Sequence, residues 1–104
     1  MKKMNKRKEI AKKFAKAIKS EYIDKIILYG SVAREEDTES SDIDILIISD
    51  HYEEIEDKVS TEVVNIIFTE KEYISAQIMN HEHFNKTKTF SFLTNVLKEG
   101  VTLE

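Results

Sequence analysis

Two short apolar runs, each joined to polar residues, constrain the fold of this chain more than any other feature. Residues 26–29 (Ile-Ile-Leu-Tyr) end at Gly30-Ser31, and Asp42-Ile43-Asp44 leads directly into residues 45–48 (Ile-Leu-Ile-Ile). Both runs are short, rich in β-branched residues and bounded by turn-forming residues, which is typical of buried strands. The sequence therefore predicts two core strands, with a Gly-Ser corner after the first and two carboxylates at the start of the second.

Asp42 and Asp44 are expected to point to the same side of the second strand. Side chains alternate along a strand, so the two carboxylates are about 7 Å apart on one face, with Ile43, Ile45 and Ile47 on the other. Two like charges at the entrance to a buried strand repel each other and resist desolvation. Mg²⁺ relieves both effects, because it commonly binds one or two carboxylates together with substrate phosphate oxygens. The alternative is that the acids only form a polar loop before the strand.

The Gly30-Ser31 corner has the features of a phosphate site. Residues 31–36 favour a short helix with Ser31 as its N-cap, and a helix start offers free backbone N–H groups to an anion. Gly30 allows a ligand to approach the backbone, and Arg34 lies on the same face of the turn as Ser31. A Gly-Ser pair after a strand is by itself more often a plain turn, so the combination with the two aspartates carries the hypothesis.

Composition limits the remaining possibilities. A chain of 104 residues that is 40% hydrophobic and 35% charged is expected to form one soluble domain, spanning residues 1–104. The chain contains no Cys, which excludes disulfides and thiolate zinc sites and fits a reducing cytosol. No apolar run approaches the roughly 20 residues of a membrane span. We therefore expect a cytoplasmic protein without membrane contact.

Positive charge is concentrated in the first twenty residues, which carry net charge +8, against −12 for the other 84. A basic segment suggests nucleic-acid binding. However, Ile10, Phe14, Ala17 and Ile18 recur at helical spacing, and no aromatic residues alternate with the lysines for stacking on bases. The sequence therefore favours a solvated helix face over a nucleic-acid interface. The segment could still contact this chain's own acidic remainder or an acidic partner.

The rest of the chain is expected to alternate helices and strands. The expected elements are a helix from Asn5 to about Ser20, a short helix over 52–59, a third strand over 63–68, a helix over 70–80 after a Thr69–Glu72 capping box, a loop over 81–88, a helix over 90–98 ending at Gly100, and an edge strand over 101–103. These elements predict an α/β fold, with a small mixed sheet of three to four strands flanked by helices.

The pattern of Gly30-Ser31, ten residues, then Asp42-x-Asp44 resembles the signature of the DNA polymerase β-like nucleotidyltransferase superfamily. With Arg34 in the Gly-Ser-x-Ala-Arg context, it is similar to the minimal nucleotidyltransferases, the MntA-type antitoxins paired with HEPN-domain toxins. This resemblance implies a polymerase β-like fold, ATP as substrate and Mg²⁺ as cofactor. It implies that Gly30, Ser31 and Arg34 bind the nucleotide, and that Asp42 and Asp44 are the catalytic metal ligands. It also implies transfer of AMP from ATP to a hydroxyl of the HEPN partner, on a tyrosine.

Two positions depart from the superfamily pattern. A third carboxylate is expected on the strand next to Asp-x-Asp, where Asn65 is the polar residue inside the predicted strand. An amide oxygen can coordinate a cation, but it brings no charge and cannot act as a base. Glu62, at the start of that strand, is a substitute ligand that would face the other side. Glu35 stands where relatives commonly carry glycine, and its carboxylate would repel a triphosphate unless it turned away.

Three functions therefore stay open from the sequence. Nothing in 104 residues resembles an acceptor-recognition domain, which favours a separate protein as acceptor and an adenylyltransferase antitoxin as the function. The second hypothesis is a non-catalytic antitoxin that binds and masks its toxin. The third is a nucleotidyltransferase acting on RNA or a small molecule, with the basic helix or a dimer partner binding the acceptor. A homodimer is a reasonable expectation for so small a sheet with exposed edges.

Overall fold

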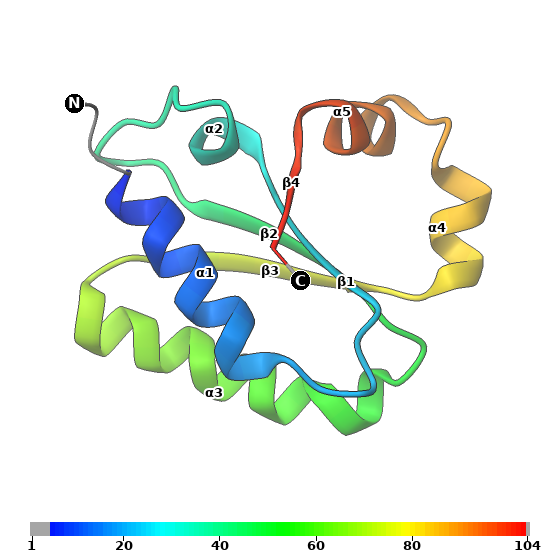
Figure 1. Ribbon diagram of the computed structural model, residues 1–104, viewed down its shortest axis with the longest axis horizontal. Helices are drawn as coiled ribbons and strands as arrows, with labels where there is room; N and C mark the ends of the chain where they lie inside the picture. Colours follow the sequence, from blue (N-terminus) through cyan, green and yellow to red (C-terminus); the bar gives the residue numbers. More distant parts are fainter. Residues whose placement is uncertain (1–4, 104) are drawn as a thin grey trace.

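A four-stranded mixed sheet with helices on both faces forms the centre of the protein (Figure 1). The computed structural model describes residues 5–103. In chain order the elements are α1 (Lys6–Ile18), β1 (Lys25–Tyr29), α2 (Gly30–Ala33), β2 (Ile43–Ile48), α3 (Tyr52–Glu70), β3 (Ile74–Met79), α4 (His81–Thr87), α5 (Ser91–Glu99) and β4 (Val101–Thr102). The α/β class expected from the sequence, with a sheet of three to four strands, is confirmed.

The strand order is β3-β2-β1-β4, and it brings the two sequence motifs together. β1 and β2 are antiparallel, so the end of β1 lies beside the start of β2, with Tyr29 opposite Asp44. β4 pairs antiparallel with β1, and β3 pairs parallel with β2. The two core strands predicted from the apolar runs are confirmed, as is the edge strand near the C-terminus.

α1 and α3 cover one face of the sheet (Figure 1). Asn5 caps α1 as expected, since its side chain accepts hydrogen bonds from the backbone N–H groups of Arg7 and Lys8. The buried side chains of this helix are Ile10, Ala11, Phe14, Ala15 and Ile18. Ala17, expected in the apolar stripe, is exposed instead, because it lies at the margin of the face centred on Phe14 and Ala15.

Residues 63–68, predicted as the third strand, form the C-terminal part of α3, and that prediction is wrong. The strand beside β2 is β3, a segment predicted as helix. Parallel strands must be joined by a crossover, and α3 is that crossover between β2 and β3. Its buried residues Ile55, Val59 and Ile66 follow helical spacing, so packing against the sheet outweighs the strand propensity of the β-branched run.

α5 covers part of the other face, packing Leu93 and Val96 against Ile27 and Leu46. The predicted helix over 90–98 and its end at Gly100 are confirmed. Residues 81–88, predicted as a loop, contain α4, which begins because the Asn80 side chain accepts a hydrogen bond from the backbone N–H of residue 83. Within residues 5–103, no helix has the length and apolar character needed to cross a membrane.

The basic N-terminal helix contacts the acidic remainder of the chain, which was one of the alternatives left open by its sequence. Lys8 pairs with Glu35 at 3.0 Å, and Lys13 pairs with Glu70 of α3 at 3.5 Å. Arg7 is bound by two further carboxylates, those of Asp37 and Glu72. Lys2 and Lys3, which belong to the same basic segment, lie outside the described residues.

Candidate active site

The Gly-Ser corner and the aspartate pair meet at one end of the sheet. Gly30 follows β1 with φ +75°, a conformation that favours glycine. A β-carbon built on Gly30 would overlap Oδ2 of Asp44, so the backbone of the corner lies directly against this carboxylate. Because Tyr29 is opposite Asp44 in the β1–β2 register, the contact follows from strand pairing. The geometry expected from the sequence is therefore present.

Asp44 lies on the face of β2 that the alternation predicts, and Asp42 directly precedes the strand. Ile43, Ile45 and Ile47 are buried in the core beneath α1 and α3, so Asp44 points to the side of the sheet that α5 partly covers. Burial raises the pKa of Asp44, and the charge of Asp42 raises it further, while Arg34 acts in the opposite direction. The half-buried Asp44 therefore lies next to the exposed Asp42, and a divalent cation would neutralise this negative charge.

Ser31 lies within the first turn of α2 and does not cap it. The helix begins at Gly30 and its N-cap is Tyr29, which makes no side-chain capping bond, so the predicted capping role of Ser31 is wrong. The reason is that Gly30 itself takes the first helical position directly after β1. The first N–H groups of a helix have no acceptor within it, so the backbone of Gly30 and Ser31 still offers donors to an anion beside Asp44.

Arg34 ends α2 and is held by two carboxylates at the edge of the site. Its Nε donates to Oε2 of Glu36 at 3.1 Å, and its Nη1 donates to Oε2 of Glu99 at 3.3 Å. These ion pairs are partly exposed, so a phosphate can compete with them for the guanidinium.

A cavity of about 220 Å³ opens beside the corner, between the end of β1 and α5. Tyr29 and Phe92 wall it, with their rings edge to face and the centroids 5.5 Å apart. The other lining residues are Gly30, Arg34, Asn95, Val96 and Glu99. Sequence reasoning missed the contribution of α5, although Phe92, Asn95, Val96 and Glu99 recur at the spacing of one helix face.

Glu35 occupies a left-handed backbone conformation, with φ +60°. Glycine adopts this conformation without strain, which explains why a glycine suits this position after the arginine. The Glu35 side chain turns to Lys8 of α1, and the Nζ–Oε1 distance is 3.0 Å. The carboxylate is therefore paired with a cation on α1, which weakens the repulsion of a triphosphate expected from its sequence position.

Asn65 does not lie on a strand next to Asp42 and Asp44, and the reason for assigning it to the metal site is wrong. It is an exposed residue of α3, the helix that packs on the sheet face opposite to the carboxylates. Glu62 is on the same helix and pairs with Lys58 at 3.5 Å. The helical conformation of residues 63–68 therefore removes both residues from the strand position of the third carboxylate.

Ser75 and Gln77 occupy the strand positions that sequence reasoning assigned to Asn65. Ser75 of β3 is opposite Asp44, and alternation places Gln77 on the same face. Neither side chain is a carboxylate. Among residues 5–103, no group of three or more His, Asp or Glu side chains is arranged to hold a metal ion. The site therefore supplies two carboxylates, and substrate or water oxygens would complete the coordination of a cation.

One relative matches this sequence over nearly its whole length. A relative in Methanocaldococcus jannaschii, named a "putative protein adenylyltransferase", is 43% identical over 104 residues, covering 96% of this chain and 99% of the relative. Two others from that organism, with the same descriptive name, are each 50% identical over 56 residues, covering 53% of this chain and 55% of each relative.

Solved structures share the fold at low sequence identity. A "putative nucleotidyltransferase" from Sulfolobus solfataricus superposes with a TM-score of 0.57 at 18% identity, covering 98% of this chain and 89% of that one. A toxin-antitoxin structure with AMP-PNP superposes with a TM-score of 0.55 at 16% identity, covering 97% and 73%. Residues 11–100 match the nucleotidyltransferase domain family, and together with the corner of Gly30 and Asp44 this shows that the chain belongs to that family.

Proposed function

We propose that this nucleotidyltransferase uses Mg²⁺ and transfers AMP from ATP to a protein hydroxyl, on a tyrosine of a HEPN-type toxin, and so acts as an antitoxin. The observation that carries the proposal is the contact between the Gly30 backbone and the Asp44 carboxylate. Two comparisons support it. The relative matched over 99% of its length is named a "putative protein adenylyltransferase", and a structure with the same fold is a toxin-antitoxin structure with AMP-PNP.

The residues present fit a magnesium ion. Asp42 and Asp44 offer carboxylate oxygens on one strand face, and the raised pKa of Asp44 reflects burial and repulsion that a cation would relieve. When bound, Mg²⁺ would neutralise charge on the triphosphate and on the leaving pyrophosphate. Asp42 and Asp44 are the residues that would hold it.

The chain's own residues bind and orient the reactants in this proposal. The backbone N–H groups at Gly30 and Ser31 bind phosphate oxygens, and Arg34 turns from Glu99 and Glu36 to the same phosphates. The acceptor oxygen attacks the α-phosphorus, and a new P–O bond forms. The bond from the α-phosphorus to the oxygen bridging to the β-phosphate breaks, pyrophosphate leaves, and the hydroxyl proton passes to water. Positioning and electrostatics supply most of the rate in such transfers.

The test is to mix the protein with a HEPN protein encoded by a neighbouring reading frame, using ATP labelled on its α-phosphate. We expect covalent label on the partner with Mg²⁺, and none with EDTA or with the Asp42→Asn, Asp44→Asn double variant. Replacement of the labelled tyrosine by phenylalanine should abolish the signal. Label on RNA or on a small molecule, with none on any protein, would contradict the protein acceptor.

A second function, masking of a toxin without catalysis, is favoured by one observation. Ser75 and Gln77 stand on β3 where a third carboxylate would help bind metal and accept the proton of the nucleophile. The same experiment separates the two functions. A stable complex that silences the partner without covalent label, in the presence of Mg²⁺ and ATP, would establish masking.

A further inference from the structure

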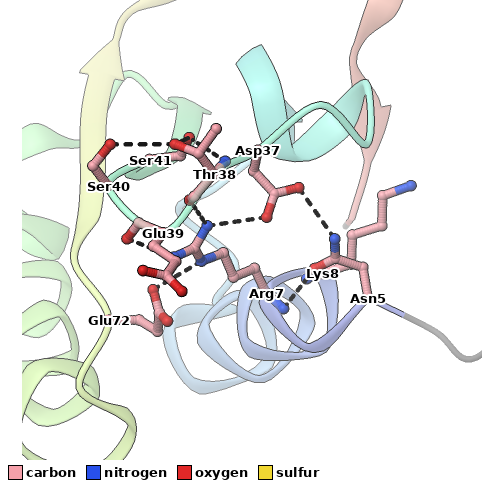
Figure 2. Close-up of polar contacts among 9 residues, drawn as sticks. All are labelled: Asn5, Arg7, Lys8, Asp37, Thr38, Glu39, Ser40, Ser41 and Glu72. Atoms are coloured by element: carbon pink, nitrogen blue, oxygen red, sulfur yellow. Dashed lines mark hydrogen bonds and ion pairs between the residues drawn. The ribbon is translucent and has the colours of Figure 1, made fainter.

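Arg7 of α1 joins three segments that are distant in sequence (Figure 2). Its Nε donates to Oε2 of Glu72 at 2.9 Å, and its Nη1 donates to Oδ2 of Asp37 at 3.0 Å. Nη1 also donates to the carbonyl of Thr38, and Nη2 donates to the carbonyl of Glu39 at 3.0 Å. The Arg7 side chain is only 13% exposed, so this cation is largely enclosed by its acceptors.

The Thr38 and Glu39 carbonyls belong to the loop that leads into the aspartate pair. The Thr38 carbonyl accepts a second hydrogen bond from the backbone N–H of Ser41, and the Ser41 hydroxyl accepts one from the backbone N–H of Thr38. Ser41 directly precedes Asp42. The Arg7 contacts therefore fix the loop within a few residues of the first carboxylate.

Glu72 connects Arg7 to the other side of the aspartate pair. It precedes Tyr73, whose carbonyl accepts the hydrogen bond from the backbone N–H of Ile43. Ile43 lies between Asp42 and Asp44, so the start of β2 is held both from the loop side and from the β3 side. Arg7 is the group shared by these two sets of contacts.

Asp37 completes the arrangement on the α1 side. One of its carboxylate oxygens accepts from Arg7, and the other accepts from the Asn5 side chain at 3.2 Å. A guanidinium is planar and has five N–H donors directed in a fork, whereas the lysine ammonium is a compact charge with three. Only an arginine can reach two carboxylates and two carbonyls in these directions.

We infer that Arg7 is a positioning residue for the metal site, which holds the loop over 37–41 and the start of β2 so that Asp42 and Asp44 face the Gly30 corner. The residue contacts neither substrate nor metal in this role and acts through the backbone. Only the expected effect of Arg7 on kcat rests on the proposed function. The effect of Arg7 on the placement of the loop can be tested whether or not the protein transfers AMP.

The test compares Arg7→Lys and Arg7→Ala with the wild type, each studied well below its own Tm. Amide hydrogen exchange is expected to accelerate at Ser41 and Ile43 in both variants, and to stay unchanged at Ile27 in β1. In the transfer assay, kcat is expected to fall about 10- to 100-fold, because small displacements of catalytic groups are costly. The KM for ATP is expected to change less than kcat, since Gly30, Ser31 and Arg34 are retained.

Lys13→Ala is the matched control, because Lys13 lies on the same helix and its side chain is 69% exposed. It should leave the exchange rates and kcat unchanged. Normal exchange at Ser41 and Ile43 in Arg7→Ala would overturn the inference, and so would a lowered Tm with wild-type kcat. If the wild type transfers no AMP, the proposed function fails. The affinity for Mn²⁺ in the presence of ATP then decides the role of Arg7. A weaker affinity in Arg7→Lys supports the inference, and an unchanged affinity overturns it.

Discussion

The backbone of Gly30 lies against the carboxylate of Asp44, with no room for a β-carbon between them. This contact joins the end of β1 to the start of β2, and so joins the proposed phosphate-binding corner to the proposed metal ligands. Because of this contact, the effect of a side chain at position 30 depends on the side chain at position 44.

Gly30→Ala should disable the site and destabilise the protein. A left-handed φ costs a residue with a β-carbon about 1–2 kcal/mol, and the methyl group would also overlap Asp44. We expect Tm to fall and Mg²⁺-dependent ATP binding, measured by calorimetry, to be lost. In an Asp44→Ala background the overlap is relieved, so Gly30→Ala should cost less stability there. An equal loss in both backgrounds would contradict the contact.

Asp44→Asn should raise stability while removing metal binding. Because the pKa of Asp44 is raised, the folded protein holds this proton more tightly than the unfolded chain, and the contribution of Asp44 to stability falls as pH rises above about 3.9. The variant avoids this loss, so we expect it to be more stable at pH 7, by about 0.5 kcal/mol, a value typical of partly exposed charges. The difference should vanish near pH 3, as followed by thermal unfolding.

Mg²⁺ provides the control for this stabilisation. It should raise the Tm of the wild type at pH 7 and have little effect on Asp44→Asn, because a ligand stabilises the state that binds it. A variant that is less stable than the wild type at pH 7 would show that Asp44 stabilises the fold. In that case the burial of Asp44 and its repulsion by Asp42 would not lower the stability of the folded protein.

Glu99→Gln should strengthen nucleotide binding. Glu99 holds Arg34 at 3.3 Å, and the phosphates of ATP must compete with it for the guanidinium. Removing the charge is expected to tighten Mg²⁺·ATP binding about 2- to 5-fold, because an exposed ion pair is weak and the gain from releasing the guanidinium is correspondingly small. Glu82→Gln is the matched control, because Glu82 pairs with Lys86 on α4. Equal effects of the two variants would assign the gain to net charge alone.

Lys71→Gly should stabilise the protein without affecting the site. Lys71 ends α3 with φ +59°, a position where glycine is preferred. Relief of this conformation should raise the free energy of unfolding by about 0.5–1 kcal/mol after the entropy of the unfolded chain is counted. Lys71→Ala, which retains the strained φ, should bring no gain. Chemical denaturation of the three proteins measures the difference.

The wrongly predicted helices, strands and loops all lie between β2 and α5. The run Val63-Val64-Asn65-Ile66-Ile67 has strand propensity, yet it is helical because α3 must cross over the sheet to start a strand parallel to β2. Thr69 and Glu72, interpreted as a capping box, lie at the end of α3 and before β3, where Glu72 binds Arg7. Local propensity could not reveal these roles, because both depend on contacts with residues distant in the chain.

The sequence by itself determined the two core strands, the amphipathic first helix, and the residue types that meet at the site, because these depend on local periodicity and on spacing along the chain. Only the tertiary structure decided which segment became the third strand, and with it that Ser75 and not Asn65 lies beside Asp44. It also decided that Arg7 holds the loop before Asp42 and that α5 walls the cavity beside Gly30. The physical reason is that strand pairing and enclosed ion pairs join residues far apart in sequence, whose meeting no local pattern records.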